Sequence, residues 1–258
     1  MNKQAAKFLK KNIFKTDEFY QFELLFKNIS RLESKSPKPL AVLERAYIYD
    51  GISIFSVLFK DLNKLIFLDY RPKSAKRRRG FQSKWITKTK LSFSKVEIKV
   101  IDTGKKFIIK NKLPNIRSLF LPNVLHHCRN FEDLLKTLVK KAKQLKKIYV
   151  FDSYIRENHQ DPDDYCRFTP SALTEVLKKI NFKEVSRQEI GNVFDVILYF
   201  VSQAKEILRR KENLKLSQKL YKLLPDLKKR RKSKKYRSLG RPHASACSAY
   251  FIEYKKAS

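Results

Sequence analysis

Histidines are the side chains of this sequence best suited to move a proton near neutral pH. His126 and His127 are adjacent, and His159 lies within the acidic segment 157–164. A histidine here could act as a general base on a hydroxyl or an amine. The spacing of His126, His159 and Asp161 would also permit a metal site. Packing and loop hydrogen bonds would account for the same residues without chemistry, so three interpretations stay open.

A polar residue stands at the end of each of five short apolar runs. Continuous apolar runs of this length are typical of strands that are buried on both faces of a parallel sheet. Ligands of such sheets bind outside the carboxyl ends of the strands, so we expect these polar residues to line one crevice. A single polar residue at a strand end would also mark simply where solvent begins. The five residues are Glu44, Asp69, Asp102, Asn123 and Asp152.

Alternating strand and helix patterns predict an α/β fold with crossover connections. Residues 1–37 predict an N-terminal helical extension, and 38–258 predict the α/β domain, with a basic helical or loop insertion at about 203–243. A final strand is expected at 246–254. The other strands are expected near 40–44, 64–69, 96–102, 117–122 and 147–152, and helices near 52–59, 131–139 and 170–180.

Two segments resemble class I S-adenosylmethionine-dependent methyltransferases of the type 11-like kind. The first is LPNVLHH, residues 121–127, which precedes a helix and a strand. The second is FDSYIRENHQDPDDYCRFTP, residues 151–170, which is similar to a family pattern H-x-x-P-x-D-Y-x-R-[FY]-T-P. The resemblance covers about 38–200. It implies a Rossmann-like, doubly wound, mostly parallel sheet of seven strands, the last of them antiparallel.

The resemblance also implies where the cofactor S-adenosylmethionine would bind. Glu44 corresponds to the acid after the family's first strand. Asp69, after the second strand, would hold the ribose hydroxyls, and Asp102, after the third, would lie on the adenine side. The family has a Gly-rich turn after its first strand, whereas residues 45–51 here contain one glycine, so this motif is degenerate. Glycines matter there because a Cβ blocks close approach to the backbone. The cofactor-binding residues implied are Glu44, Gly51, Asp69, Asp102 and Asn123.

The resemblance implies methyl transfer to an oxygen or nitrogen nucleophile of an unknown small-molecule or glycan acceptor. The catalytic residues expected are His126, His127 and His159, without a metal. Tyr165 and Arg167 are expected to bind substrate, although Arg167 would also fit a structural role beside the acidic segment. The alternative is a catalytically degenerate scaffold of the same fold that binds RNA, a membrane surface or another protein.

The net charge of +34 predicts attraction to anionic partners. Its local clusters are Arg77-Arg78-Arg79 and residues 228–241, which would suit nucleic acid or an anionic membrane surface. A genome rich in A and T would also produce a lysine-rich composition without selection for binding. No apolar run reaches the length of a membrane span, and three cysteines form no disulfide framework. We therefore expect a cytoplasmic protein that could be peripheral at the membrane.

Overall fold

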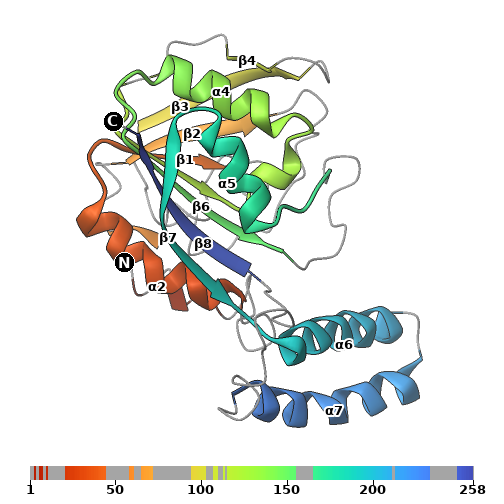
Figure 1. Ribbon diagram of the computed structural model, residues 1–258. Helices are drawn as coiled ribbons and strands as arrows, with labels where there is room; N and C mark the ends of the chain where they lie inside the picture. Colours follow the sequence, from red (N-terminus) through yellow and green to blue (C-terminus); the bar gives the residue numbers. More distant parts are fainter. Residues whose placement is uncertain are drawn as a thin grey trace.

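The computed structural model contains one mixed sheet of eight strands (Figure 1). The strand order is β4-β3-β2-β1-β5-β6-β8-β7. The structure describes residues 3, 6, 7, 10, 21–44, 58–60, 65–71, 94–102, 107–109, 113, 115–154, 165–210, 213–232 and 249–257. The described strands are β1 (Leu40–Glu44), β2 (Leu65–Arg71), β3 (Ser94–Asp102), β4 (Phe107–Ile109), β5 (Ser118–Pro122), β6 (Lys147–Ser153), β7 (Phe182–Ile190) and β8 (Ala249–Lys256).

The five strands predicted from apolar runs form a parallel array. β1 pairs with both β2 and β5, β2 with β3, and β5 with β6, all in parallel. The final strand, β8, runs antiparallel between β6 and β7. The Rossmann-like α/β class expected from the sequence is therefore confirmed. The sheet has eight strands where seven were expected, because β4 adds an antiparallel strand beside β3.

Helices cover both faces of the sheet (Figure 1). On one face, α4 (Phe131–Lys141) and α5 (Pro170–Lys178) share a buried apolar cluster with the strands. On the other face, α2 (Gln21–Lys35) shares a second cluster. β5 is buried at every residue, and its side chains divide between the two clusters, with Leu119 and Leu121 in the first and Phe120 in the second. This explains why buried parallel strands appear as unbroken apolar runs.

Short polar side chains determine where the helices on the first face begin. The Asn130 side chain accepts a hydrogen bond from the Asp133 amide, and Thr169 accepts one from the Ala172 amide. Each satisfies one of the backbone donors that the first turn of a helix leaves unpaired. Thr169 is thus the N-cap of α5, and Pro170 occupies the first helical position, where its missing amide hydrogen costs no hydrogen bond.

The predicted N-terminal extension includes α2, which packs directly on the sheet. Leu25 and Ile29 are fully buried in the second apolar cluster. Arg31 donates to the Glu253 carboxylate on β8 at 2.5 Å, and Lys147 on β6 donates to the same group at 2.6 Å. The hydrogen bond to Glu253 raises the pKa of Lys147. α2 is therefore held both by apolar burial and by a carboxylate shared with β6.

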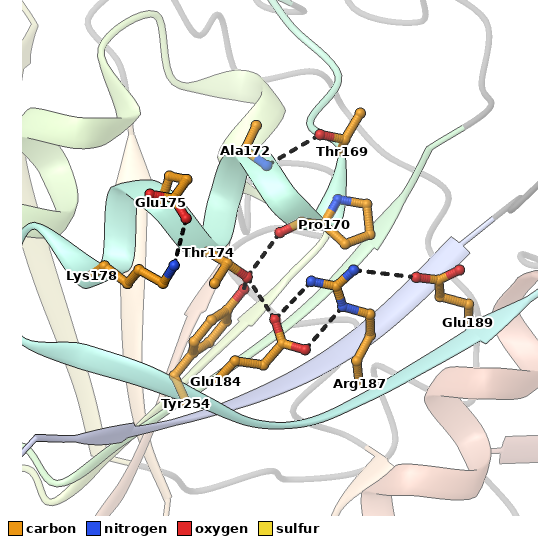
Figure 2. Close-up of polar contacts among 10 residues, drawn as sticks. All are labelled: Thr169, Pro170, Ala172, Thr174, Glu175, Lys178, Glu184, Arg187, Glu189 and Tyr254. Atoms are coloured by element: carbon orange, nitrogen blue, oxygen red, sulfur yellow. Dashed lines mark hydrogen bonds and ion pairs between the residues drawn. The ribbon is translucent and has the colours of Figure 1, made fainter. Parts of the chain in front are cut away.

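A second polar cluster joins α5 to the β7–β8 edge of the sheet (Figure 2). The Thr174 hydroxyl lies 2.7 Å from the Glu184 carboxylate and 3.1 Å from the Tyr254 hydroxyl, and Arg187 donates to Glu184 at 2.8 Å. Burial raises the pKa of Tyr254. Tyr254 lies opposite Ile148 near the start of β6, so this cluster is at the amino-terminal edge of the parallel strands. It stabilises the fold at the edge opposite the strand ends that were predicted to bind ligand.

We expect the Glu184 carboxylate to stabilise the folded chain above about pH 4.5 and to lose that effect in acid. Partial burial alone would raise its pKa, but hydrogen bonds from Arg187 and Thr174 outweigh burial and hold the pKa below the ordinary 4.5. A lowered pKa means that the contribution is complete above the unfolded pKa and disappears as pH falls through the folded one. Glu184→Gln should therefore lower the free energy of unfolding by about 1 kcal/mol at pH 7.

Urea unfolding at pH 7 and pH 3 measures this difference directly. The loss should be present at pH 7 and should become much smaller at pH 3, where the wild-type carboxyl is also protonated. Glu175→Gln is the matched control, because the Glu175 side chain is exposed on α5 and pairs there with the exposed Lys178. An equal loss at both pH values would contradict the assignment.

The basic insertion expected at about 203–243 overlaps two paired helices, the first of which begins earlier, at Val193. α6 (Val193–Arg210) and α7 (Leu214–Lys232) pack side by side beyond the ends of β7 and β8 (Figure 1). Asn192 caps α6 by accepting from the Phe194 amide, and Asn213 accepts from the Leu216 amide at the start of α7. Of the two forms expected, helical or loop, the described part of this region is mostly helical.

Candidate active site

Two acidic residues lie at the same level near the carboxyl ends of two adjacent parallel strands. Glu44 at the end of β1 is the register partner of Asp69 on β2. β1 is also the strand at which the sheet order reverses, because β2 lies on one side of it and β5 on the other. In open α/β sheets this reversal creates a crevice outside the carboxyl ends of the strands. The backbone register thus brings two of the predicted cofactor-binding residues to one place.

Asp102 occupies a different level on its strand. Asp69 is in register with Glu97 of β3, whereas Asp102 lies five residues further along and pairs with Phe107 of β4. Five residues of extended chain span about 16 Å. The sequence placed Asp102 with the other strand-end acids because it follows the last apolar residue of the run. The register shows that β3 extends beyond the end of β2, so Asp69 and Asp102 do not lie at the same level of the sheet.

Asn123, directly after β5, has a left-handed backbone. Its φ is 51°, and its amide donates to the Phe151 carbonyl on β6 at 2.6 Å. Asparagine tolerates this conformation better than most residues, because its short polar side chain can hydrogen-bond locally. The turn therefore directs the chain from β5 into the short 3₁₀ helix η4 (Leu125–His127).

Substitutions at Asn123 should separate backbone strain from side-chain function. Asn123→Ala should destabilise the chain by about 1–2 kcal/mol, because a Cβ disfavours positive φ, while Asn123→Gly should cost much less. Thermal or urea unfolding of both variants measures the difference. Equal stability of the two variants would show that this turn does not require a left-handed residue.

The histidines of η4 are buried beside the end of β6. The His126 Nδ1 atom lies 3.1 Å from the Oδ1 atom of Asp152, and both side chains are almost fully buried. The same Asp152 oxygen accepts from the Ser153 amide at 2.8 Å. The His127 ring packs against the His126 ring at a centroid distance of 4.0 Å. The structure therefore joins the predicted His126 and the strand-end Asp152 in one buried pair.

This pairing determines the tautomer of a neutral His126 ring. An ionised carboxylate can only accept hydrogen bonds, so Nδ1 carries the hydrogen and Nε2 is the basic nitrogen. A carboxylate that fixes an imidazole in this way is the arrangement that general-base histidines use in enzymes. When such a ring accepts a proton at Nε2, the neighbouring carboxylate, here that of Asp152, stabilises the imidazolium that results.

Tyr165 and Arg167 lie on the segment that directly precedes α5. The Tyr165 amide donates to the His126 carbonyl at 2.9 Å, so this segment is attached to η4. The Arg129 guanidinium lies over the Tyr165 ring at 5.1 Å. Arg167 donates to the Cys166 carbonyl at 2.8 Å. Tyr165 is therefore adjacent to the histidine pair, and Arg129 is a neighbour that sequence reasoning did not identify.

Several predicted residues fall outside the described residues. They include Gly51, His159 and the basic cluster Arg77-Arg78-Arg79, together with part of 228–241. The catalytic role expected for His159 therefore stays a prediction. Within the described ranges, no group of three His, Cys, Asp or Glu side chains is arranged to hold a metal ion. No helix in the described part has the length and apolar character needed to cross a membrane.

Solved structures with a similar fold include two named methyltransferases. No protein-family model and no curated protein sequence matches this chain. Magnesium protoporphyrin IX methyltransferase from Synechocystis PCC 6803 is 6% identical, with 95% of this chain and 88% of that chain covered and a TM-score of 0.45. Phosphoethanolamine N-methyltransferase 2 from Haemonchus contortus is 13% identical, with 98% and 61% covered and a TM-score of 0.46. Both were solved with S-adenosylhomocysteine.

A third similar structure carries a different name. The cyclopropane-fatty-acyl-phospholipid synthase-like protein from Lactobacillus casei ATCC 334 is 11% identical, with 93% of this chain and 92% of that chain covered and a TM-score of 0.45. The resemblance is one of fold. At this level of similarity, the three structures assign a role to no residue of this chain.

Proposed function

We propose that this chain is an S-adenosylmethionine-dependent methyltransferase that acts on an oxygen or nitrogen nucleophile. The observation that carries the proposal is the level pair Glu44 and Asp69, at the carboxyl ends of adjacent strands where the sheet order reverses. A carboxylate can accept hydrogen bonds from two hydroxyls, which is what recognition of a ribose requires. The acceptor is a small molecule or a glycan.

Two residues at the ends of adjacent strands would meet such a cofactor in this proposal. Asp69 would accept from the ribose hydroxyls and Glu44 would lie beside the methionine part, as the sequence resemblance implies. Asn123, with its left-handed turn, would contribute to the same edge of the sheet. Gly51 and Asp102 complete the set proposed from the sequence. When bound, S-adenosylmethionine supplies a methyl group on an already activated sulfonium, so the chain has mainly to align the nucleophile and exclude water.

His126 is the general base in this proposal. Its Nε2 atom would take the proton from the acceptor hydroxyl or amine as the new bond to carbon forms. Asp152 would hold the ring in the required tautomer, and burial of the pair would keep water from competing. His127 would support the His126 ring by packing. His159 stays a candidate for the opposite side of the site.

Tyr165 and Arg167 would contact the acceptor in this proposal. The Tyr165 amide donates a hydrogen bond to the His126 carbonyl, so Tyr165 is a direct neighbour of the proposed base. The Arg129 guanidinium over that ring adds a positive charge at the same place. Such an environment would suit an acceptor with an aromatic or anionic part.

Incubation with methyl-labelled S-adenosylmethionine and fractionated metabolites tests the proposed activity. The expected result is labelled product and an equal amount of S-adenosylhomocysteine, both dependent on the protein. Tight cofactor binding without label transfer to any fraction would favour the scaffold alternative. Absence of both binding and transfer would contradict the proposal.

A further inference from the structure

The hairpin formed by α6 and α7 stands at the carboxyl edge of the parallel strands. Ile190 at the end of β7 and Ser153 at the end of β6 are both register partners of Ala249, the first residue of β8. The chain therefore leaves the sheet for α6 at the edge where open α/β sheets bind ligands. Figure 1 shows the two helices beyond this edge.

Each helix of the hairpin uses one side to hold the other helix. Leu198 on α6 and Leu224 on α7 are buried, and the Ser217 hydroxyl donates to the Lys205 carbonyl at 3.2 Å. Ser217 and Leu224 are seven residues apart in α7, so they share one side of that helix. The opposite side of α7 consequently faces away from α6.

The outward side of α7 carries a row of lysines. Lys215, Lys219, Lys222 and Lys229 are exposed, and we call them the lysine face. At about 100° per residue they fall within an arc of about 80°, which is centred roughly opposite Ser217 and Leu224. They extend over about 21 Å along the helix axis. A narrow, regular row of cations therefore runs along the exposed side of the helix.

The lysine face has no acidic partner among the residues that the structure describes. Asp226, the one acid in the sequence of α7, is paired with Arg230 at 2.7 Å. Lysines three or four positions apart, such as Lys215, Lys219 and Lys222, repel one another along a helix. An anionic partner on this face would remove that repulsion, whereas a second copy of the same face would increase it.

The composition of the lysine face indicates a phosphate backbone rather than a lipid surface. A helix that lies in a bilayer surface needs a broad apolar side that enters the acyl chains. Within the arc of the lysines the only other residue is Asp226, so this side offers a bilayer no apolar side chain. The exposed Phe200 and Ile207 of α6 lie on the far side of the hairpin. Nucleic acid requires cations alone, because its phosphates are neutralised by lysine and arginine.

The shape of the lysine face favours duplex DNA among nucleic acids. The face is the convex surface of one helix, and an α-helix with its side chains is about 10–12 Å across. The major groove of B-form DNA is about 12 Å wide and admits an α-helix, whereas the major groove of A-form RNA is too narrow to enter. Lysine binds phosphate as a point charge, and phosphate contacts carry no sequence information.

We propose that the lysine face of α7 binds duplex DNA through its phosphates, without sequence preference. α7 lies in the major groove, and its four ammonium groups contact phosphates that border the groove. α6 stays outside the groove because it packs on the opposite side of α7. The net charge of +34 steers the protein toward DNA, while the lysine face determines which surface makes the contact. The proposal is independent of methyl transfer.

Fluorescence anisotropy of a labelled DNA duplex, titrated with the full chain at several salt concentrations, tests the proposal. Lys219→Gln together with Lys222→Gln should lower the slope of log affinity against log salt by about 2, because each phosphate contact contributes about 0.9. At 0.1 M salt the same variant should bind at least about tenfold more weakly, by the same factor for duplexes of different sequence. Lys219→Arg together with Lys222→Arg keeps both charges and should retain the slope.

Lys140→Gln together with Lys143→Gln is the matched control. Both lysines are exposed at the end of α4, which leads from η4 back to the start of β6, so they lie toward the opposite edge of the sheet. This pair should leave the slope unchanged and the affinity within about twofold of wild type. Glutamine is a good helix former, so the variants should fold, which circular dichroism checks.

Three results would overturn the proposal. Equal losses of slope in the α7 pair and the α4 pair would show that net charge alone drives binding. Duplex RNA that binds as tightly as DNA, with the same loss in the α7 pair, would show that the face does not enter the major groove. Loss of binding to phosphatidylglycerol vesicles in the α7 pair, with DNA binding unchanged, would assign the lysines to a lipid surface.

Discussion

Replacing His126 by glutamine should lower the rate of methyl transfer by about 10²–10⁴-fold, with little change in affinity for S-adenosylmethionine. The expected loss is large because the Nε2 atom of His126 is the proposed proton acceptor, while the proposed cofactor contacts lie on β1 and β2. Single-turnover label transfer and equilibrium cofactor binding, measured on the same preparation, separate the two effects.

Two further variants define what this result means. His127→Gln changes the same type of side chain one residue away and keeps the His126–Asp152 pair, so we expect a much smaller loss of rate. Asp152→Asn removes the carboxylate that accepts from Nδ1, so the rate should fall because the wrong tautomer becomes accessible. Equal losses for His126→Gln and His127→Gln, or unchanged rates for both, would contradict the assignment of the base.

Replacing Asp69 by alanine should weaken cofactor binding by about 1–3 kcal/mol, or 5–150-fold. This is the magnitude expected when a ligand loses charge-assisted hydrogen bonds from its hydroxyls. Glu175→Ala is the matched control, since it removes one carboxylate from the surface of α5, away from the strand ends. Calorimetric titration with S-adenosylhomocysteine measures both variants. Unchanged affinity in a folded Asp69→Ala protein would exclude the proposed role of this residue.

The buried strands could be predicted because a strand that is buried on both faces is apolar at nearly every position, which produces an unbroken apolar run in the sequence. The run expected at 40–44 is β1 itself, and the runs near 117–122 and 147–152 correspond to β5 and β6. β7, at Phe182–Ile190, was not predicted as a strand, because buried or half-buried and exposed residues alternate along it at the sheet edge. β4 has only three residues, too few for a pattern.

The candidate site was predictable as a set of residues but not as a set of contacts. The sequence identified His126 by its chemistry and Asp152 as a polar strand end, yet it did not pair them. Their hydrogen bond spans 26 positions and depends on β5 lying beside β6, with a left-handed turn at Asn123 between β5 and η4. The contact between Arg129 and Tyr165 likewise requires a fold before it can be seen.

For α6 and α7 as well, the sequence indicated the type of structure but not which side chains would be buried. The sequence predicted a basic helical or loop insertion at about 203–243, but it did not show which apolar side chains would be covered. Only the packing of α6 on α7 shows that Leu198 is buried while Phe200 and Ile207 are exposed. The basic character of 228–241 was evident from the sequence, whereas its continuity with a helix that carries exposed leucines was not.

Calorimetric titration of the unmodified chain with S-adenosylhomocysteine tests the central claim most directly. The proposal that the crevice at β1 and β2 is a cofactor site predicts saturable binding of one molecule per chain, competed by S-adenosylmethionine and weakened by Asp69→Ala. A folded chain that takes up no S-adenosylhomocysteine and no S-adenosylmethionine at millimolar concentration would contradict it.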